Sequence, residues 1–213
     1  EACFEYIINV YLSMKRTFEE ALANRRSYYH ISHDSPVADD EIIRIIHEAV
    51  KHVPSAYNSQ STRIVLLLGD EHQKLWEIVK KILKMMLPEE VFVKSEKKID
   101  TSFSSGYGTV LFFEDTSVVG KFMEAFPLYS GNFKTWSQHT SAMHQFTVWA
   151  MLEDLGFGAS LQHYNPLIDE DVKRTWHLPK EWELIAQMPF GMPLEAPGEK
   201  TFKPLEERVK VFK

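Results

Sequence analysis

The stretch PSAYNSQSTRIVLLLG, residues 54–69, passes from a polar loop into an uninterrupted apolar run. Proline, serine and asparagine in PSAYNSQS favour turns, because the proline ring and the short polar side chains constrain the backbone locally. The run RIVLLLG is rich in large aliphatic side chains and ends at a glycine, which predicts a strand buried on both faces. The polar loop is therefore expected to lie directly at one end of a core strand.

Helical periodicity precedes and follows this stretch. Residues 39–53 begin with acidic side chains, carry apolar residues at helical spacing and stop before Pro54, which predicts a helix. Residues 71–87 show a similar apolar stripe and predict another helix. A shorter helix is expected over residues 17–24 and is predicted to end at Asn24.

The second half of the chain predicts one long helix among strands. Residues 137–155 carry apolar side chains around most of the helix circumference, as expected of a core helix or a subunit interface. GTVLFFED and EWELIAQMPFG each predict a strand, and GFGASLQHYNP closes the long helix and opens a further strand. Residues 120–137 are aromatic-rich without a clean period and are expected to form loop and short helix. The irregular alternation of helices and strands indicates an α+β or mixed three-layer α/β class.

The bulk composition narrows the classes of function. The chain has 213 residues, a formal net charge of −6 and 44% hydrophobic residues, as is typical of globular proteins. The acidic balance argues against nucleic acid or an anionic membrane as a partner, and no apolar run reaches the roughly 20 residues of a membrane span. The single cysteine, Cys3, excludes an internal disulfide and favours a reducing, cytoplasmic location.

Residues 1–13 lack the basic start and the cleavage site of a signal peptide. We expect them to be an N-terminal extension to a domain that spans residues 14–213. Either this segment reflects the choice of start site at Met14, or it packs as an additional amphipathic helix.

Familiar catalytic and metal-binding motifs are absent from the sequence. There is neither G-x-x-x-x-G-K-[ST] nor a G-x-G-x-x-G after a strand. Two histidine pairs, His47 with His52 and His139 with His144, are spaced i, i+5, which puts each pair on different helix faces. We therefore expect no metal site and no hydrolytic triad. Gly156 is interpreted as the cap of the long helix.

Two polar segments remain open to more than one interpretation. Arg25 and Arg26 offer planar forks that can bind a phosphate, and Ser27 adds a donor. Alternatively, both arginines pair with distant carboxylates on the surface. In PSAYNSQ, the amides of Asn58 and Gln60 can read the polar edge of a ring system, or the segment is a turn between helix and strand.

Taken together, four segments resemble the FMN-dependent nitroreductase family. They are RRSYY, PSAYNSQSTRIVLL, VWAMLEDLGFGASLQHYNPLID and MPFGMPLEAPGEKTFKPLEERV, in this order. The last two are similar to the branch of the fungal fatty-acid-repression-mutant-like proteins and the small bacterial nitroreductases. The resemblance covers residues 14–212.

This resemblance implies a fold and an activity. The fold is α+β, a nitroreductase-like three-layer α-β-α sandwich with a mixed, mainly antiparallel sheet. The protein is expected to be a homodimer with FMN at the subunit interface, using NADH or NADPH to reduce nitroaromatic or quinone-type acceptors by ping-pong hydride transfer through flavin N5. No protein side chain is expected to act as acid, base or nucleophile. The alternative is a flavin-binding regulatory or stress and lipid-signalling protein with incidental reductase activity.

The resemblance also implies where FMN is held. The residues expected to contact FMN come from both subunits. One subunit supplies Arg25, Arg26, Ser27, Gly158, Ala159, Ser160 and Lys200, and the other supplies Pro54, Ser55, Ala56, Asn58 and Gln60. One backbone N–H of the Gly158–Ser160 segment is expected to face N5. Tyr29 stands where relatives often have a basic residue, and Phe202 where many have an arginine, so that Lys203 is the expected substitute.

The aromatic residues between 122 and 136 are open to two interpretations. They form a cover over the site of a small aromatic electron acceptor, or they are plain packing. The sequence names neither the physiological acceptor nor the preferred nicotinamide nucleotide.

Overall fold

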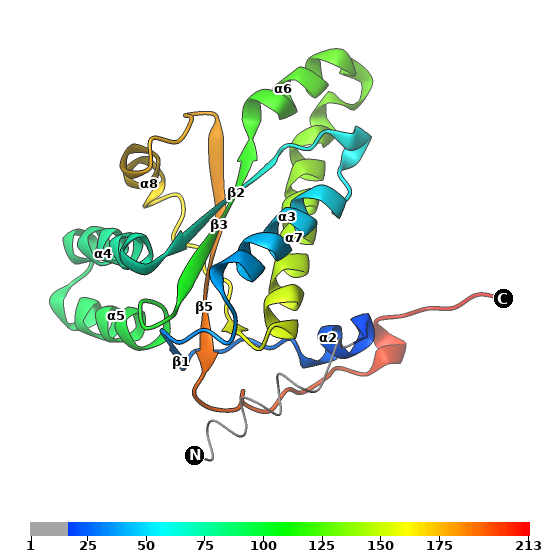
Figure 1. Ribbon diagram of the computed structural model, residues 1–213. Coiled ribbons are helices and arrows are strands. Elements are labelled where there is room, and N and C mark those ends of the chain that lie inside the picture. Colours follow the sequence, from blue (N-terminus) through cyan, green and yellow to red (C-terminus); the bar gives the residue numbers. More distant parts are fainter. Residues whose placement is uncertain (1–16) are drawn as a thin grey trace.

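The computed structural model describes residues 17–213 (Figure 1). The expected extension over residues 1–13 lies outside the described residues, so its role stays a prediction. Between residues 17 and 213, no helix has both the length and the apolar composition that a membrane crossing requires.

A five-stranded sheet forms the centre of the fold. Its order is β1-β5-β3-β2, with β4 paired to β5, and every strand pair is antiparallel. The bounds are β1 Ile31–Ser32, β2 Thr62–Leu68, β3 Gly108–Asp115, β4 Gly158–Ala159 and β5 Trp182–Pro193. Parallel pairing occurs in the described chain as an isolated bridge between Ser27 and Ala159. The expected mainly antiparallel sheet is therefore confirmed.

The strand predicted to be buried on both faces is not the most buried one. β2 is at the edge of the sheet, and its residues from Arg63 to Leu66 are only half-buried. β3 lies between β5 and β2, and all of its residues are buried. The prediction for RIVLLLG was wrong in this respect, because an apolar run does not say which neighbours a strand has.

Helices cover both faces of the sheet, which confirms the three-layer α+β sandwich (Figure 1). One layer contains α3 Asp39–His52 and α7 Ser130–Asp154. The other contains α4 Gly69–Met86, α5 Glu89–Ser102 and α8 Asp169–Thr175. The predicted helices over 39–53 and 71–87 are confirmed.

The alternation of side chains along β3 joins the two layers. Val110 and Phe112 pack among α3 and α7, whereas Leu111 and Phe113 pack among α4, α5 and α8. Successive residues of a strand point to opposite faces, so one strand supplies both cores.

The region expected to be loop with short helix is mostly helical. α6 spans Thr116–Ala125, a 3-10 turn spans Pro127–Tyr129, and α7 begins at Ser130, seven residues earlier than predicted. Asp115 caps α6, because its carboxylate accepts from the N–H of Ser117 at 3.0 Å. Apolar periodicity missed α6 because Val119 is its only buried residue and its one aromatic side chain, Phe122, packs against the rings of Phe126 and Phe133.

α5 and α8 were not predicted at all. α5 is mostly charged, and its buried positions are Phe92, Ile99 and Ser102. α8 is short and buries only Val172. Such narrow stripes give little periodic signal, and these helices form because they cover the sheet.

A directional chain of hydrogen bonds joins α4 to β3. The indole of Trp76 donates to Thr109 Oγ1 at 3.1 Å, and the Thr109 hydroxyl lies 2.8 Å from His72 Nδ1. His72 Nε2 lies 3.2 Å from the Ser104 carbonyl. All donors and acceptors are matched if the imidazole is neutral and carries its proton on Nε2. Burial lowers the pKa of His72 to about 4, partly offset by the bond to Ser104.

This histidine is expected to make the protein acid-sensitive. Its folded pKa lies below the ordinary value of 6.5, so the unfolded chain binds more protons between about pH 4 and 6.5, and stability falls as pH drops through that window. From pH 7 to pH 5, His72 should account for a loss of about 2 kcal/mol in the free energy of unfolding. Urea unfolding of wild type and His72→Gln at both pH values measures this difference.

The control is His47→Gln, which removes an exposed histidine of α3. It removes an imidazole without touching the bonds of His72 to Thr109 and Ser104, and it is measured at the same two pH values. Equal acid destabilisation of wild type and His72→Gln would contradict the assignment.

Candidate functional site

The arginine–serine segment is bound to β4. α2, Phe18–Asn24, ends as predicted, and the N–H of Arg25 donates to the Ala21 carbonyl. Ser27 forms the parallel bridge with Ala159, and the N–H of Tyr28 donates to the Ala159 carbonyl at 3.0 Å. The structure therefore brings together two segments that are far apart in the sequence.

The end of α7 directs the chain into β4. Gly156 has φ 90°, a left-handed conformation that glycine adopts without steric penalty. The N–H of Gly156 donates to the Glu153 carbonyl and the N–H of Phe157 to the Leu152 carbonyl, both at 2.9 Å. This pair of bonds is a Schellman motif. The interpretation of Gly156 as a helix cap is confirmed.

Arg25 and Arg26 present two adjacent positive charges. The guanidinium carbon of Arg25 lies 4.4 Å from the centroid of the Trp149 ring on α7. Burial, and then the charge of Arg26, lower the pKa of Arg25, which remains protonated. In the part of the chain from residue 17 onward, neither arginine forms an ion pair with a carboxylate. The alternative of surface pairing with distant carboxylates therefore has no support in the described residues.

The C-terminal segment passes the same place. Arg26 donates a hydrogen bond to the Gly198 carbonyl, two residues before Lys200. Lys200 and Lys203 are exposed, and Nζ of Lys200 lies 5.2 Å from the ring centroid of Phe202. Arg26 thus holds the tail, two residues before Lys200, against the arginine–serine segment.

Lys98 of α5 is a cation that the sequence reasoning missed. Its Nζ lies 5.8 Å from the ring centroid of Tyr29, which is exposed beside the arginine–serine segment. α5 was not predicted, so no signal in the sequence connected this lysine to Tyr29. The charge that Tyr29 does not supply is present nearby on another element.

The Gly158–Ser160 segment is buried and its backbone is largely engaged. The N–H of Ser160 donates to the Pro189 carbonyl at 3.2 Å, so this donor is not free for a ligand. The Ser160 hydroxyl accepts from the Gln162 side chain at 3.1 Å. The expected donor to flavin N5 is therefore not the backbone N–H of Ser160.

The loop over residues 54–60 has an unusual backbone. Tyr57, Asn58 and Gln60 have φ values of 55°, 52° and 51°. These lie in the left-handed region of the backbone, which residues other than glycine rarely adopt. Each such residue costs about 1–3 kcal/mol and persists where surrounding contacts hold it. Ser55 provides two of them: its hydroxyl accepts from the N–H of Gln60 and its carbonyl from the N–H of Asn58, both at 3.0 Å. The loop does join α3 to β2, as the turn interpretation expects, and three left-handed residues are held within it.

The two halves of the predicted site lie at different ends of α7. Tyr57 of the loop contacts Trp136, with ring centroids 6.2 Å apart, while Arg25 lies over Trp149. These tryptophans are 13 residues apart on α7, which is about 20 Å at about 1.5 Å per residue. One chain therefore brings Arg25, Arg26 and Ser27 to Ala159, but not to the loop.

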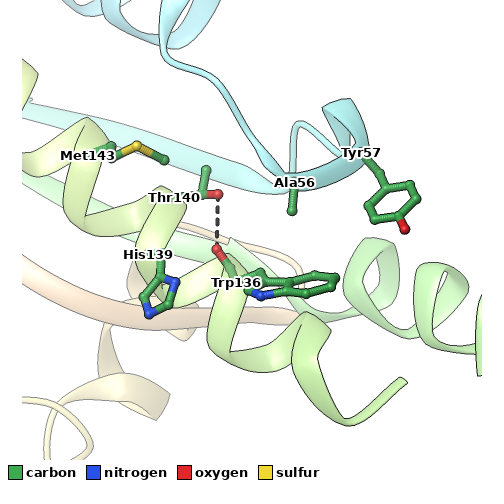
Figure 2. A pocket seen from close by; sticks show the side chains of 6 residues that line it. All are labelled: Ala56, Tyr57, Trp136, His139, Thr140 and Met143. Atoms are coloured by element: carbon green, nitrogen blue, oxygen red, sulfur yellow. Dashed lines mark hydrogen bonds between the residues drawn. The ribbon is translucent and has the colours of Figure 1, made fainter. Parts of the chain in front are cut away.

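Two cavities lie along α7. One, of about 300 Å³, is lined by Ala56 and Tyr57 from the loop and by Trp136, His139, Thr140 and Met143 of α7 (Figure 2). The other, of about 510 Å³, lies between α7, the segment after β4 and the start of β5, and includes Gln138, Gln145, His163, Asn165 and Glu183. The first, called the aromatic cavity below, has the rings of Tyr57 and Trp136 in a mostly apolar lining. The second has several polar side chains in its lining, although most of its surface is also apolar.

No cluster of metal ligands occurs in the described residues. His144 is buried in α7 with Nδ1 2.9 Å from the Thr140 carbonyl, and burial lowers its pKa. His139 is exposed and lines the aromatic cavity. The site thus offers cations, amides and aromatic rings for binding.

Comparison with known proteins finds relatives over most of the chain. The sequence profile of the Nitroreductase family matches residues 22–192. The nitroreductase FRM2 of Saccharomyces cerevisiae is 32% identical over 193 residues, which are 90% of this chain and 95% of that protein. The structure of the nitroreductase CinD from Lactococcus lactis in complex with nicotinic acid has a TM-score of 0.86 and 42% identity, covering 92% of this chain and 100% of that chain. Its complex with 4-nitrophenol gives a TM-score of 0.84, with the same identity and coverage.

Gly158 tests how the arginine–serine segment is held. A Cβ at this position would lie 2.7 Å from Tyr28 Cγ and 3.1 Å from Pro193 Cγ. Gly158→Ala should therefore lower the free energy of unfolding by about 1–3 kcal/mol through overpacking. Gly120→Ala is the matched control, because a Cβ there meets nothing within 4 Å in a helix. It should stabilise by about 0.5–1 kcal/mol. Urea unfolding checks both, and no loss in Gly158→Ala would contradict the packing argument.

Proposed function

The chain belongs to the nitroreductase family, oxidoreductases that act on nitro compounds, and from this premise we propose that it is an FMN-dependent reductase. NADH or NADPH is the electron donor, and nitroaromatic or quinone-type compounds are the acceptors, in a ping-pong cycle. When bound, FMN supplies the chemistry of accepting and donating hydride at N5. The observation that carries the proposal is the pairing of the arginine–serine segment with β4, through the bridge of Ser27 with Ala159 and the bond from the Tyr28 N–H.

The donor set at this junction fits the phosphate of FMN. A phosphate monoester carries nearly two negative charges at neutral pH. Two guanidiniums and a hydroxyl provide charge-assisted hydrogen bonds to such a group. In this proposal, Lys200 and Lys203 of the tail that Arg26 holds, and Lys98 next to Tyr29, add positive charge around it. The arginines have no carboxylate partner in the described chain, so an anionic ligand would relieve their mutual repulsion.

A homodimer is part of the proposal, because one chain does not bring the two halves together. The arginines and the loop of residues 54–60 are about 20 Å apart along α7. A second copy related by a two-fold axis, with its α7 antiparallel to the first, brings its own loop toward the arginines. We propose that Pro54, Ser55, Ala56, Asn58 and Gln60 contact the flavin ring in this way.

The aromatic cavity supports an aromatic acceptor. Tyr57 and Trp136 are stacked at an interplanar angle of 23°, and the cavity between the loop and α7 has room beside them (Figure 2). Planar electron-poor rings such as nitroaromatics and quinones stack on such side chains. The complex of the relative CinD with 4-nitrophenol is in keeping with this class.

The residues of the chain hold and orient instead of transferring protons. Arg25, Arg26 and Ser27 fix the phosphate end, and the buried Gly158–Ser160 segment forms a rigid wall beside it. Protons for the reduced acceptor can come from water.

Loss of the two arginines should abolish tight flavin binding. We expect wild type to carry about one FMN per chain. Arg25→Ala with Arg26→Ala should weaken the affinity at least about 100-fold, because each charge-assisted hydrogen bond contributes roughly 1.5–3 kcal/mol. Flavin absorbance and titration of the apoprotein measure the effect, while sedimentation reports the dimer.

The control removes two exposed arginines elsewhere, Arg44→Ala with Arg174→Ala. It should retain FMN, since it changes the net charge equally without touching the site. A wild-type protein that is colourless and cannot be reconstituted with FMN would contradict the proposal. Flavin that turns over slowly with every acceptor would favour the regulatory alternative.

Trp136 is expected to contribute to binding of the acceptor. Trp136→Ala should raise KM for nitroaromatics about 2- to 10-fold, because one aromatic stacking contact is worth roughly 0.5–1.5 kcal/mol. The KM for NADH or NADPH should change less.

Leu128→Ala serves as the comparison, because Leu128 is 85% exposed and does not line the cavity. Steady-state kinetics give KM of the acceptor and of NADH or NADPH for each variant. If both variants leave KM of the acceptor unchanged, the aromatic cavity is not the acceptor site.

A further inference from the structure

Glu114 is a buried carboxylate at the end of β3 that the proposed chemistry does not use. Only 1% of its surface is exposed. It accepts a hydrogen bond from the hydroxyl of Ser61 at 2.5 Å and another from the hydroxyl of Thr62. In the chain from residue 17 onward it forms no ion pair. A buried carboxylate without an ion pair calls for an explanation.

The two donors are consecutive residues, and this has a geometric consequence. In a regular strand, successive side chains point to opposite faces. Ser61 and Thr62 can both reach one carboxylate because Ser61 still belongs to the loop and Thr62 is the first residue of β2. Glu114 therefore sets the direction of the backbone at the point where the loop becomes strand.

A second set of bonds fastens the same point from the other side. Arg63 donates from Nη1 to the Gln60 carbonyl at 2.7 Å and from Nη2 to the Asp115 carboxylate at 3.0 Å. The N–H of Asp115 donates to the Ser61 carbonyl at 2.9 Å. Glu114 and Asp115 thus act as neighbouring anchors on β3, the first buried and the second against Arg63.

What these anchors hold is the loop with three left-handed residues, Tyr57, Asn58 and Gln60. Strained backbone relaxes when its supports are removed. The support inside the loop comes from Ser55. The support at its C-terminal end comes from Glu114 and Arg63.

We propose that Glu114 is a positioning residue, which holds the loop of residues 54–60 in the shape that it presents to the flavin of the partner subunit. The inference rests on the proposed function where it concerns flavin, but not where it concerns the loop. Glu114 itself contacts no ligand in this proposal.

The ionisation of Glu114 is set by groups on three elements. Burial raises its pKa, whereas the hydrogen bonds from Ser61 and Thr62 and the charge of Arg63 lower it, and Glu183 on β5 raises it. Protonation would turn one acceptor oxygen into a donor facing two hydroxyls. Glu114→Gln makes a similar change permanently, because an amide nitrogen replaces one oxygen.

The first test measures the loop without flavin. Hydrogen exchange of the backbone amides of residues 55–61 should be at least about tenfold faster in Glu114→Gln than in wild type, with exchange in α4 and α5 unchanged. Thr62→Val keeps the shape and removes one donor, so it should give a smaller increase at the same residues. It also serves if Glu114→Gln does not fold.

The second test measures flavin affinity. Glu114→Gln should weaken the Kd of FMN about tenfold at pH 8, and the ratio of the two Kd values should shrink toward acid, where wild-type Glu114 is itself protonated. Taking the ratio cancels the titration of the FMN phosphate. The control is Leu75→Ala, a substitution in the core of α4. The two variants are compared under conditions in which both have lost the same thermal stability, and Leu75→Ala should keep the wild-type affinity for FMN.

The outcomes separate this inference from the proposed function. Unchanged hydrogen exchange of the loop in Glu114→Gln overturns the role of Glu114, whatever the affinity for FMN. If that variant does not fold, unchanged exchange in Thr62→Val overturns it. Equal weakening of FMN binding in Glu114→Gln and Leu75→Ala also overturns it, because stability alone then explains the loss. Faster loop exchange in a protein that never binds FMN supports the anchor and removes the flavin assignment.

Discussion

The fold depends on a single constraint, the burial of β3 on both faces. A strand that is apolar on both sides is stable in water only when helices cover each face and neighbouring strands satisfy its backbone. α3 and α7 cover one face, and α4, α5 and α8 cover the other. The polar residues on β3 are bonded to neighbours: Thr109 to Trp76 and His72, and Glu114 to Ser61 and Thr62. Burial of this strand therefore also dictates where polar side chains must find partners.

The layer that covers β3 also determines how the proposed site is divided. α7 is 25 residues long, and its two ends carry the contacts of different segments: Trp136 with the loop, Trp149 with Arg25. A rigid helix keeps these contacts apart, which is why the proposed site takes its second half from another chain.

Much of the fold was predictable from sequence, and the misses have physical causes. α3, α4 and the strands β3 and β5 have strong apolar patterns and were predicted near their observed bounds. α5, α6 and α8 each bury few residues, so their sequences carry little helical periodicity. At the candidate site, a family resemblance implied that the arginine–serine segment and the Gly158–Ser160 segment belong to one site, and Ser27 does pair with Ala159. Lys98, Arg63 and Glu114 were not implied in this way, because their partners lie on other elements.

The sequence by itself determined the class of fold, the family and the residue types available for binding an anion and a ring. These depend on local patterns and on short motifs, which are complete within a few residues. Only the tertiary structure decided that β2 is an edge strand, that the arginines lack carboxylate partners in the described chain and that the loop is held from β3. Those properties depend on which segments become neighbours in space, and a neighbour is set by the packing of the whole sheet and its two helical layers.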